Sequence, residues 1–307
     1  MSKEEEYLAR VLSAADFKFK PLVIDGIDNE PVYECFGKHL AVEETCLFSR
    51  RIASGQAYID LLHSSLQDCL QGKNEMPVVR FADGEYAFYA QSLKCNGLYQ
   101  QAESVGAIRR AIPYHIEMLR RLAEHGWLAP LVHQGNIAAP KRSLWAFLRR
   151  SKSEGTALQF LELLAGNDIS LTADNYIPFY VLYAYLTSPD FAALVHGKHI
   201  CILNSTCNVE AGKAWFARRG SEPRLTFVEI PDSFVATRWQ EMRPEILARV
   251  PADCDLCLVG AGIGSLPVCV DLASTFAVPA IDAGHVLNMM NARKDKSNGA
   301  RLYTIWK

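Results

Sequence analysis

Short apolar runs and longer amphipathic stretches alternate along most of this chain. The apolar runs, which indicate buried strands, lie at 77–82, 127–134, 199–204, 224–230, 255–261 and 278–282. Helical spacing predicts helices at 85–94, 102–124 (bent or restarted at Pro113), 141–150, 154–164, 209–220, 236–250 and 266–276. Strands buried on both faces and joined by helices are typical of a parallel sheet. We therefore predict an α/β fold, a Rossmann-like, mainly parallel sheet with helices on both faces.

The N-terminal part has a different pattern. Apolar residues at three-and-four spacing from Val42 to Leu70 predict a helix, so we expect residues 1–70 to form a helical N-terminal extension and 71–307 the Rossmann-like domain. The most apolar segment, 176–186, is too short to span a bilayer and contains Pro178, which favours a core helix. No apolar core follows a basic start at the N-terminus, so we expect no signal peptide and no transmembrane segment.

Composition limits the partners. The 307 residues are 50% hydrophobic and 21% charged, enough for a large core, and the net charge of -2 does not favour nucleic acid. The nine cysteines are odd in number and mostly in apolar surroundings, which favours reduced thiols and a cytoplasmic protein. Cys254 and Cys257 have the spacing of half a zinc site. We expect their thiols on opposite faces of a strand, with no second Cys/His pair at ligand spacing.

Unusual residues follow four of the predicted strands. They are Arg80 with Asp83-Gly84-Glu85, the segment 204–208 (NSTCN), the segment 260–265 (GAGIGS) and the segment 282–285 (DAGH). Ligands of parallel α/β sheets bind at the carboxyl ends of the strands. We therefore expect Asp83, Glu85, the 260–265 turn and 282–285 to converge on one cleft there.

The 260–265 turn resembles part of a dinucleotide-binding fingerprint. Gly260, Gly262 and Gly264 could let backbone N–H groups approach a phosphate, and Asp282 lies where a ribose-binding acid would lie. Ser265 stands where that fingerprint wants glycine. A tight strand-to-helix turn that needs small residues for packing explains the same pattern.

Asp83 and Glu85 form a D-x-E pair where a buried strand ends. Two neighbouring carboxylates repel each other unless positive charge lies with them, and a divalent cation bound by hard oxygen ligands supplies it. Alternatively, Asp83 caps the following helix and Glu85 supports its first turn. The residues alone favour neither interpretation.

The segment VVRFADGEYAF resembles the R-F-G-D-G-E segment of bacterial GT-D-type glycosyltransferases, and the region that ends in DAGH resembles their C-terminal signature. The resemblance implies that Asp83 and Glu85 bind Mn²⁺ or Mg²⁺ in a catalytic domain, with Arg80 as the leading arginine of the motif. Gly260, Asp282, Gly284 and His285 match the C-terminal signature. His285 could donate to a phosphate oxygen, although a histidine at a helix start can also be structural.

The resemblance implies transfer of a sugar from a nucleoside diphosphate sugar to a hydroxyl of a glycan or glycoprotein acceptor, and it is compatible with a homo-oligomer. This sequence departs from the family pattern at two places, and the second concerns the donor sugar and the acceptor more than the metal. Ala82 replaces a glycine, and Asn204-Ser205-Thr206 stands where an acidic residue and an arginine are expected. The catalytic base is unassigned, with Asp174 and Glu210 as candidates.

Two other function classes use the same residues differently. A dinucleotide- or S-adenosylmethionine-dependent enzyme would use the 260–265 turn and Asp282 but would leave Asp83 and Glu85 without a role. A non-catalytic nucleotide-sugar-binding protein is the other, because a fold does not fix a function. Manganese-dependent hydrolysis of a nucleotide sugar separates the first class from a glycosyltransferase, and turnover with any acceptor excludes the second.

The cysteine pattern gives a first prediction. We expect all nine thiols to be unpaired, so the melting temperature measured by differential scanning calorimetry should be the same with and without reductant. A marked loss of thermal stability on reduction would reveal a structural disulfide.

Overall fold

The computed structural model describes residues 12, 16–24, 45–94, 100–137 and 156–291. Its main element is a six-stranded sheet in the order β4-β3-β8-β7-β5-β6, and every neighbouring pair is parallel. The strands are β3 (Met76–Phe81), β4 (Trp127–Pro130), β5 (His199–Asn204), β6 (Arg224–Glu229), β7 (Leu256–Gly260) and β8 (Pro279–Asp282). The predicted Rossmann-like α/β fold is confirmed, because each predicted strand overlaps one of these six.

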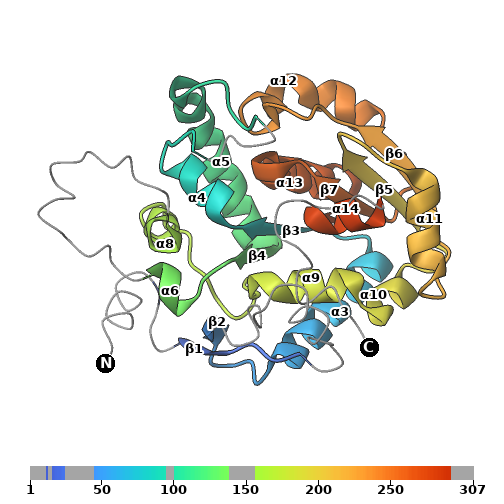
Figure 1. Cartoon of the computed structure of the whole chain (residues 1–307), viewed down its shortest axis with the longest axis horizontal. Coiled ribbons are helices and arrows are strands. Elements are labelled where there is room, and N and C mark those ends of the chain that lie inside the picture. The colour runs from blue at the N-terminus through green and yellow to red at the C-terminus, as the bar shows by residue number, and fades with distance from the viewer. Residues whose placement is uncertain (1–11, 13–15, 25–44, 95–99, 138–155, 292–307) are drawn as a thin grey trace, which may run out of the picture.

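Helices cover both faces of this sheet (Figure 1). One face carries α5 (Val105–His125), α12 (Val235–Ala248) and α13 (Ser265–Phe276), and the other carries α3 (Gly55–Gly72), α9 (Phe179–Thr187), α10 (Pro189–Leu194) and α14 (His285–Met290). The remaining helices are α4 (Asp83–Tyr89), α6 (Gln134–Ile137), α8 (Ala157–Ala165), α11 (Val209–Ala217) and the short 3₁₀ turn η1 (Gly262–Gly264).

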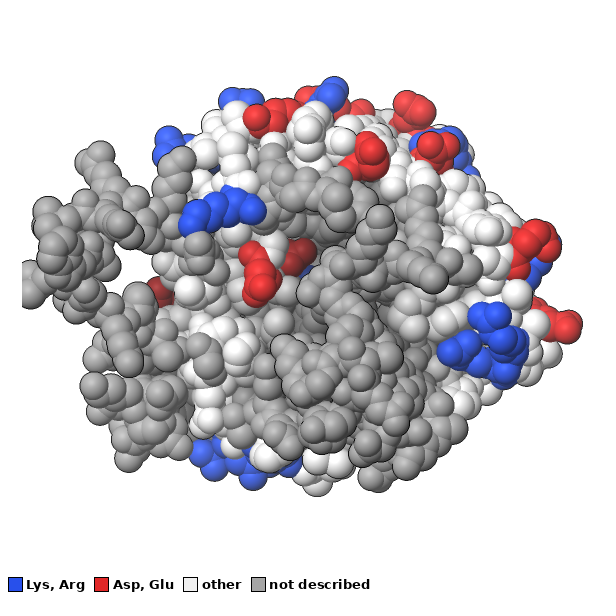
Figure 2. Space-filling model, in the orientation of Figure 1, with Lys and Arg blue, Asp and Glu red and all other residues white. Residues whose placement is uncertain are grey.

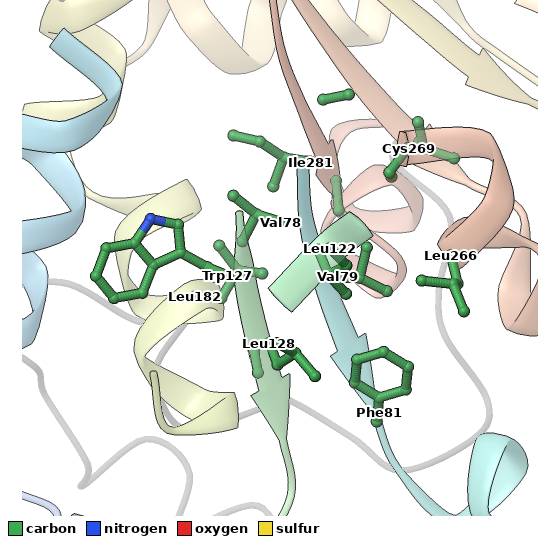
Figure 3. Close-up of a cluster of buried hydrophobic side chains, with 14 of the residues drawn as sticks. Val78, Val79, Phe81, Leu122, Trp127, Leu128, Leu182, Leu266, Cys269 and Ile281 are labelled. Atoms are coloured by element: carbon green, nitrogen blue, oxygen red, sulfur yellow. The ribbon is translucent and has the colours of Figure 1, made fainter. Parts of the chain in front are cut away.

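The core lies where strand side chains meet both helical layers. Val78, Val79 and Phe81 of β3 are buried together with Ile281 of β8 and Leu182 of α9 (Figure 3). Five of the six residues of β3 are buried, so this strand presents apolar side chains to both faces. Two-sided burial explains why the run reads as continuously apolar rather than alternating.

A buried carboxylate joins three helices on one face. Asp271 of α13 is 1% exposed and accepts hydrogen bonds from Tyr114 Oη of α5 (2.9 Å) and Trp239 Nε1 of α12 (2.7 Å). Arg243 Nε of α12 lies 3.1 Å from its Oδ2, and Arg121 of α5 also faces it at 3.9 Å. Two hydrogen bonds and two arginine side chains therefore stabilise one carboxylate that burial alone would penalise.

The N-terminal extension is less helical than predicted. Residues 45–49 form β2 (Thr45–Ser49), which pairs antiparallel with β1 (Phe17–Pro21), so the helix predicted from Val42 is wrong at its start. The helix α3 begins only at Gly55, because the Ser54 hydroxyl accepts the N–H of Ala57 and fixes the N-terminus there. The division of the chain at residue 70 stays a prediction.

Two predicted helices run through a proline. The helix α5 is one continuous helix with Pro113 in its interior, so the restart allowed there does not occur. The helix α12 likewise contains Pro244. The helix predicted at 141–150 lies outside the described residues.

The described cysteines are all free thiols: Cys46, Cys69, Cys201, Cys207, Cys254, Cys257 and Cys269. The expectation that Cys254 and Cys257 lie on opposite faces of a strand is wrong, because β7 begins at Leu256 and Cys254 precedes it. Their sulfur atoms are 4.0 Å apart, too far for a disulfide bond.

The surface agrees with the small net charge. Acidic and basic side chains are interspersed over the described part of the face that Figure 2 shows. In the part of the chain that the structure describes, no helix has both the length and the apolar composition needed to cross a membrane.

The Asp271 cluster gives a stability prediction. We expect Asp271→Asn to lower the free energy of unfolding by about 2–3 kcal/mol, because it removes the buried negative charge that Arg243 and Arg121 face and weakens hydrogen bonds that now go to a charged acceptor. Tyr114→Phe removes a single donor and should cost about 1 kcal/mol. Urea denaturation followed by circular dichroism measures both. Equal losses for the two variants would show that the carboxylate does not hold the helices together.

Candidate functional site

The D-x-E segment spans the junction between β3 and α4. Strand β3 ends at Phe81, Ala82 is the N-cap residue of α4, and Asp83 is the first residue of the helix. The Glu85 side chain turns back toward the strand, and its Oε2 accepts the N–H of Ala82 at 2.8 Å. The sequence pattern predicts the D-x-E pair at the end of a strand. In the structure both carboxylates belong to the first turn of a helix.

In the capping interpretation Asp83 caps the helix and Glu85 supports its first turn, but the hydrogen bond to the N-cap residue is made by Glu85. Glu85 is the third residue of α4 and bonds the N-cap N–H, which is the acidic half of a capping box. Asp83 is exposed, whereas Glu85 is half-buried. Loss of water around the Glu85 carboxyl, together with the nearby charge of Asp282, raises its pKa to about 7, although the Ala82 N–H bond opposes this shift.

The two carboxylates fit a cation that a substrate also helps to hold. No group of three or more His, Cys, Asp or Glu side chains suited to a metal occurs among the described residues. A complete protein cage is therefore not formed there. Mg²⁺ and similar ions are commonly bound by one or two carboxylates together with substrate phosphates and water. Asp83 and Glu85 offer oxygen donors of this kind, and the metal role that the resemblance implies for them stays a prediction.

Arg80, at the end of β3, forms a buried ion pair with Asp282 at the end of the neighbouring strand β8. Arg80 Nη2 lies 2.8 Å from Asp282 Oδ1, and Arg80 Nε donates to the Asp282 carbonyl at 3.0 Å. The two side chains are 11% and 3% exposed. The charge of Asp282 keeps the pKa of Arg80 above its ordinary value although burial acts in the opposite direction.

The Arg80 guanidinium also contacts helix α9, and through Tyr183 it is linked to the start of α14. Its Nη1 donates to Tyr183 Oη, and the group lies over the rings of Tyr183 and Phe179, 4.7 and 5.4 Å from their centroids. Tyr183 Oη is 3.2 Å from His285 Nδ1. Gly284 has φ +42°, and a Cβ atom there would overlap the Arg80 guanidinium, so this position needs glycine.

The Gly-rich turn is largely closed by hydrogen bonds within the protein. The N–H of Ile263 donates to Gln101 Oε1 at 3.1 Å, that of Gly264 to the Ala261 carbonyl, and that of Ala261 to Ser265 Oγ. The Gln101 side chain also occupies the space beside Gly262, which has φ +56°. A phosphate could reach the Ile263 N–H only if Gln101 moved away, and the other two N–H groups have acceptors within the turn itself.

Most of the predicted site residues lie close together. A Cβ at Gly84 would be 3.9 Å from Ile263 Cγ1, so the start of α4 lies beside the Gly-rich turn. Arg80 connects the same region to Asp282 and, through Tyr183, to His285. The ends of β3, β7 and β8 therefore meet at one edge of the sheet, as the strand-end argument predicts.

The two candidate bases lie in other surroundings. Asp174 has an 86% exposed side chain that lies 4.0 Å from Arg51. Glu210 pairs with Lys213 one helical turn away. Neither has a contact with the Arg80 network that supports a catalytic role.

Tyr183 and Gln101 are the residues of this region that sequence reasoning missed. Tyr183 lies in an apolar helix where every residue but Tyr180 is buried, so nothing in the pattern separates it from its neighbours. Gln101 lies in a connection without apolar periodicity. A spatial contact with Arg80 or Gly262 is the signal that identifies them, and it exists only in the folded chain.

Surface hollows occur beside this region. One of about 480 Å³ lies between Ser205 and Thr206, residues 229–232, and Arg249. A second, of about 250 Å³, lies between α5 and α12. The described residues that line them do not include Asp83 or Glu85, so the single cleft expected around those carboxylates stays a prediction.

Known proteins give only a distant comparison. No family model matches the chain, and no curated protein matches it. Two solved structures of domain of unknown function 1792 are similar, one of them described as having "a distinct glycosyltransferase fold". Both are 17% identical; they cover 78% and 79% of this chain and 88% of their own, with TM-scores of 0.44 and 0.45. A likeness this remote gives no residue of this chain a role.

The raised pKa of Glu85 gives a pH-dependent prediction. At pH values between the ordinary pKa of Glu85 and about 7, the folded protein keeps a proton that the unfolded chain releases. Glu85 therefore contributes stability at low pH, and this contribution is lost as the pH rises through 7. Glu85→Gln keeps an acceptor for the Ala82 N–H without the charge. We expect this variant to gain about 1 kcal/mol over the parent at pH 8, in chelator, and little at pH 4.5.

Denaturant melts at the two pH values measure this difference, and Glu85→Ala is the control. Alanine removes the capping bond and should destabilise the protein at both pH values by about 1 kcal/mol relative to Glu85→Gln. A gain for Glu85→Gln that is the same at pH 4.5 and pH 8 would contradict the raised pKa.

Proposed function

We propose that this protein is a metal-dependent glycosyltransferase that moves a sugar from a nucleoside diphosphate sugar to an acceptor hydroxyl. The observation that carries the proposal is the grouping of Arg80, Asp83, Glu85 and Asp282 beside the 260–265 turn. These are the residues on which the resemblance to GT-D-type enzymes rests, and they are drawn from segments some two hundred residues apart in the sequence. Grouping at the carboxyl ends of parallel strands is the usual place for a ligand site.

The residues of this group have separable tasks. Asp83, exposed at the start of α4, and Glu85 would hold Mn²⁺ or Mg²⁺, which when bound neutralises charge on a departing diphosphate. Arg80 is paired with Asp282 and contacts neither carboxylate through a hydrogen bond among the described residues. Its task is to fix the ends of β3 and β8, and thereby the region that faces the donor.

The dinucleotide alternative receives less support. Its phosphate would need the N–H groups of the 260–265 turn, but three of these already have acceptors within the protein. Its ribose would need Asp282, which is buried against Arg80. A non-catalytic nucleotide-sugar-binding protein would use the same residues as the proposed enzyme, so it remains the competing class. Measurable turnover with an acceptor separates the two.

The proposal is tested through the two carboxylates. Nucleotide sugars are first screened by thermal shift with and without Mn²⁺, because a ligand that binds only the folded state raises the melting temperature. Isothermal titration of the donor found is then repeated on Asp83→Asn and Glu85→Gln. We expect each substitution to weaken metal-dependent donor binding by about 2–4 kcal/mol while folding stability barely falls.

Glu124→Gln is the matched control. It removes a 72% exposed carboxylate at the end of α5, directly before β4 begins, and should leave donor binding unchanged. If Asp83→Asn binds metal and donor like the parent, the proposal loses its main support. Donor binding that does not depend on the metal would favour a different class of enzyme.

A further inference from the structure

Tyr183 connects Arg80 and His285, two residues of the candidate site. None of the hydrogen bonds described above joins these two residues directly. It lies in the middle of α9, is fully buried, and accepts a hydrogen bond from Arg80 Nη1. The same hydroxyl lies 3.2 Å from His285 Nδ1, at the start of α14. A single phenol oxygen thus joins the ion pair of β3 and β8 to the histidine that follows β8.

The chemistry of the groups fixes the direction of the first hydrogen bond in this chain, and the His285 tautomer decides the direction of the second. A guanidinium can only donate, so the Tyr183 oxygen is the acceptor toward Arg80. The remaining hydroxyl hydrogen can then donate to His285 Nδ1, which must be unprotonated to accept it. In a neutral imidazole the proton is then on Nε2.

We propose that Tyr183 is a positioning residue that fixes His285 as the Nε2–H tautomer, so that His285 donates from Nε2 to a diphosphate oxygen of the donor. This inference rests on the proposed function for the identity of the ligand. It adds to the site a residue outside both segments that resemble the glycosyltransferase family. Histidines that act at functional sites commonly have their ring orientation and tautomer set by a hydrogen bond to the second ring nitrogen.

The surroundings hold the Tyr183 hydroxyl in place. The Arg80 guanidinium lies over the Tyr183 ring, 4.7 Å from its centroid, while its Nη2 is bound to Asp282. Phe179 packs edge-on against the same ring, with centroids 5.2 Å apart. The positive φ of Gly284 lets the chain pass the guanidinium closely and places His285 directly after it. The phenol is therefore fixed by packing on rigid elements, which a positioning role requires.

Tyr183→Phe tests this role because it removes the hydroxyl and keeps the ring. In the parent, ¹⁵N-detected NMR of histidine-labelled protein should show His285 as the Nε2–H tautomer; its signal is assigned by its loss in His285→Gln. In Tyr183→Phe we expect that signal to change to a mixture of tautomers. Affinity for the nucleotide sugar should fall by roughly ten- to a hundredfold, the range seen when the partner that orients a ligating histidine is removed.

Tyr185→Phe is the matched control. Tyr185 lies one residue beyond Ala184 in the same helix, is also fully buried, and its hydroxyl lies 3.1 Å from His63 Nδ1. Its removal breaks a hydrogen bond of the same kind and should change the His63 signal alone, with donor affinity unchanged. A general loss of packing in α9 would lower the affinity in both variants and would overturn the positioning role.

A double substitution separates positioning from a direct effect of Tyr183. The amide of His285→Gln can donate to a phosphate oxygen without any tautomer to fix, so adding Tyr183→Phe to it should cause no further loss of affinity. An additional tenfold loss would show that Tyr183 does not act through His285 and would overturn the inference.

The outcomes also distinguish this inference from the proposed function. If no nucleotide sugar binds to the parent, the proposed function fails, whereas the NMR tautomer is still measured and decides the Tyr183–His285 relation. If donor binds but Tyr183→Phe leaves the His285 tautomer unchanged, the inference alone is overturned. A tautomer change with unaltered affinity excludes His285 as a donor to the ligand.

Discussion

The buried ion pair between Arg80 and Asp282 determines how this edge of the sheet is built. Two charges taken out of water are costly unless their geometry is good and their other polar groups are bonded. Here the guanidinium uses its Nε and both terminal nitrogens on Asp282 and Tyr183, and two aromatic rings cover its faces. Removal of either partner would leave a buried charge, which typically costs 3–5 kcal/mol. The ends of β3 and β8 are therefore held in one arrangement.

This pair also shapes the charge that remains for a ligand. Arg80 and Asp282 largely cancel each other, so Arg80 offers Glu85 little net compensation. Glu85 consequently has a raised pKa and bonds the Ala82 N–H, while Asp83 is left as an exposed carboxylate next to it. Under the proposed function, Asp83 and Glu85 would together hold the cation, and its charge would counteract the rise in the pKa of Glu85.

Sequence reasoning predicts the sheet well because each strand is a short apolar run between helices, and burial on both faces leaves that pattern in β3 or β5. It fails where a single hydrogen bond decides. The Ser54 cap, rather than periodicity, sets where α3 begins. At α4 the N-cap bond is made by Glu85, whereas the sequence offered Asp83 as the capping residue in one of two open interpretations. The contact of Tyr183 with the site could not be predicted from the sequence. A helix that is buried on nearly all sides has no hydrophobic periodicity to indicate which of its residues faces the site.

The residues of the site differ in whether a strand, a helix or a connecting segment carries them. Arg80, Tyr183 and His285 lie on strands or helices whose neighbours are buried, so their positions are set before any ligand arrives. Gln101, in contrast, reaches the Gly-rich turn from a connecting segment and can be displaced without breaking a helix or strand. Donor binding would then need only local changes, the exchange of a proton at Glu85 and the withdrawal of one amide side chain, on a scaffold that stays fixed.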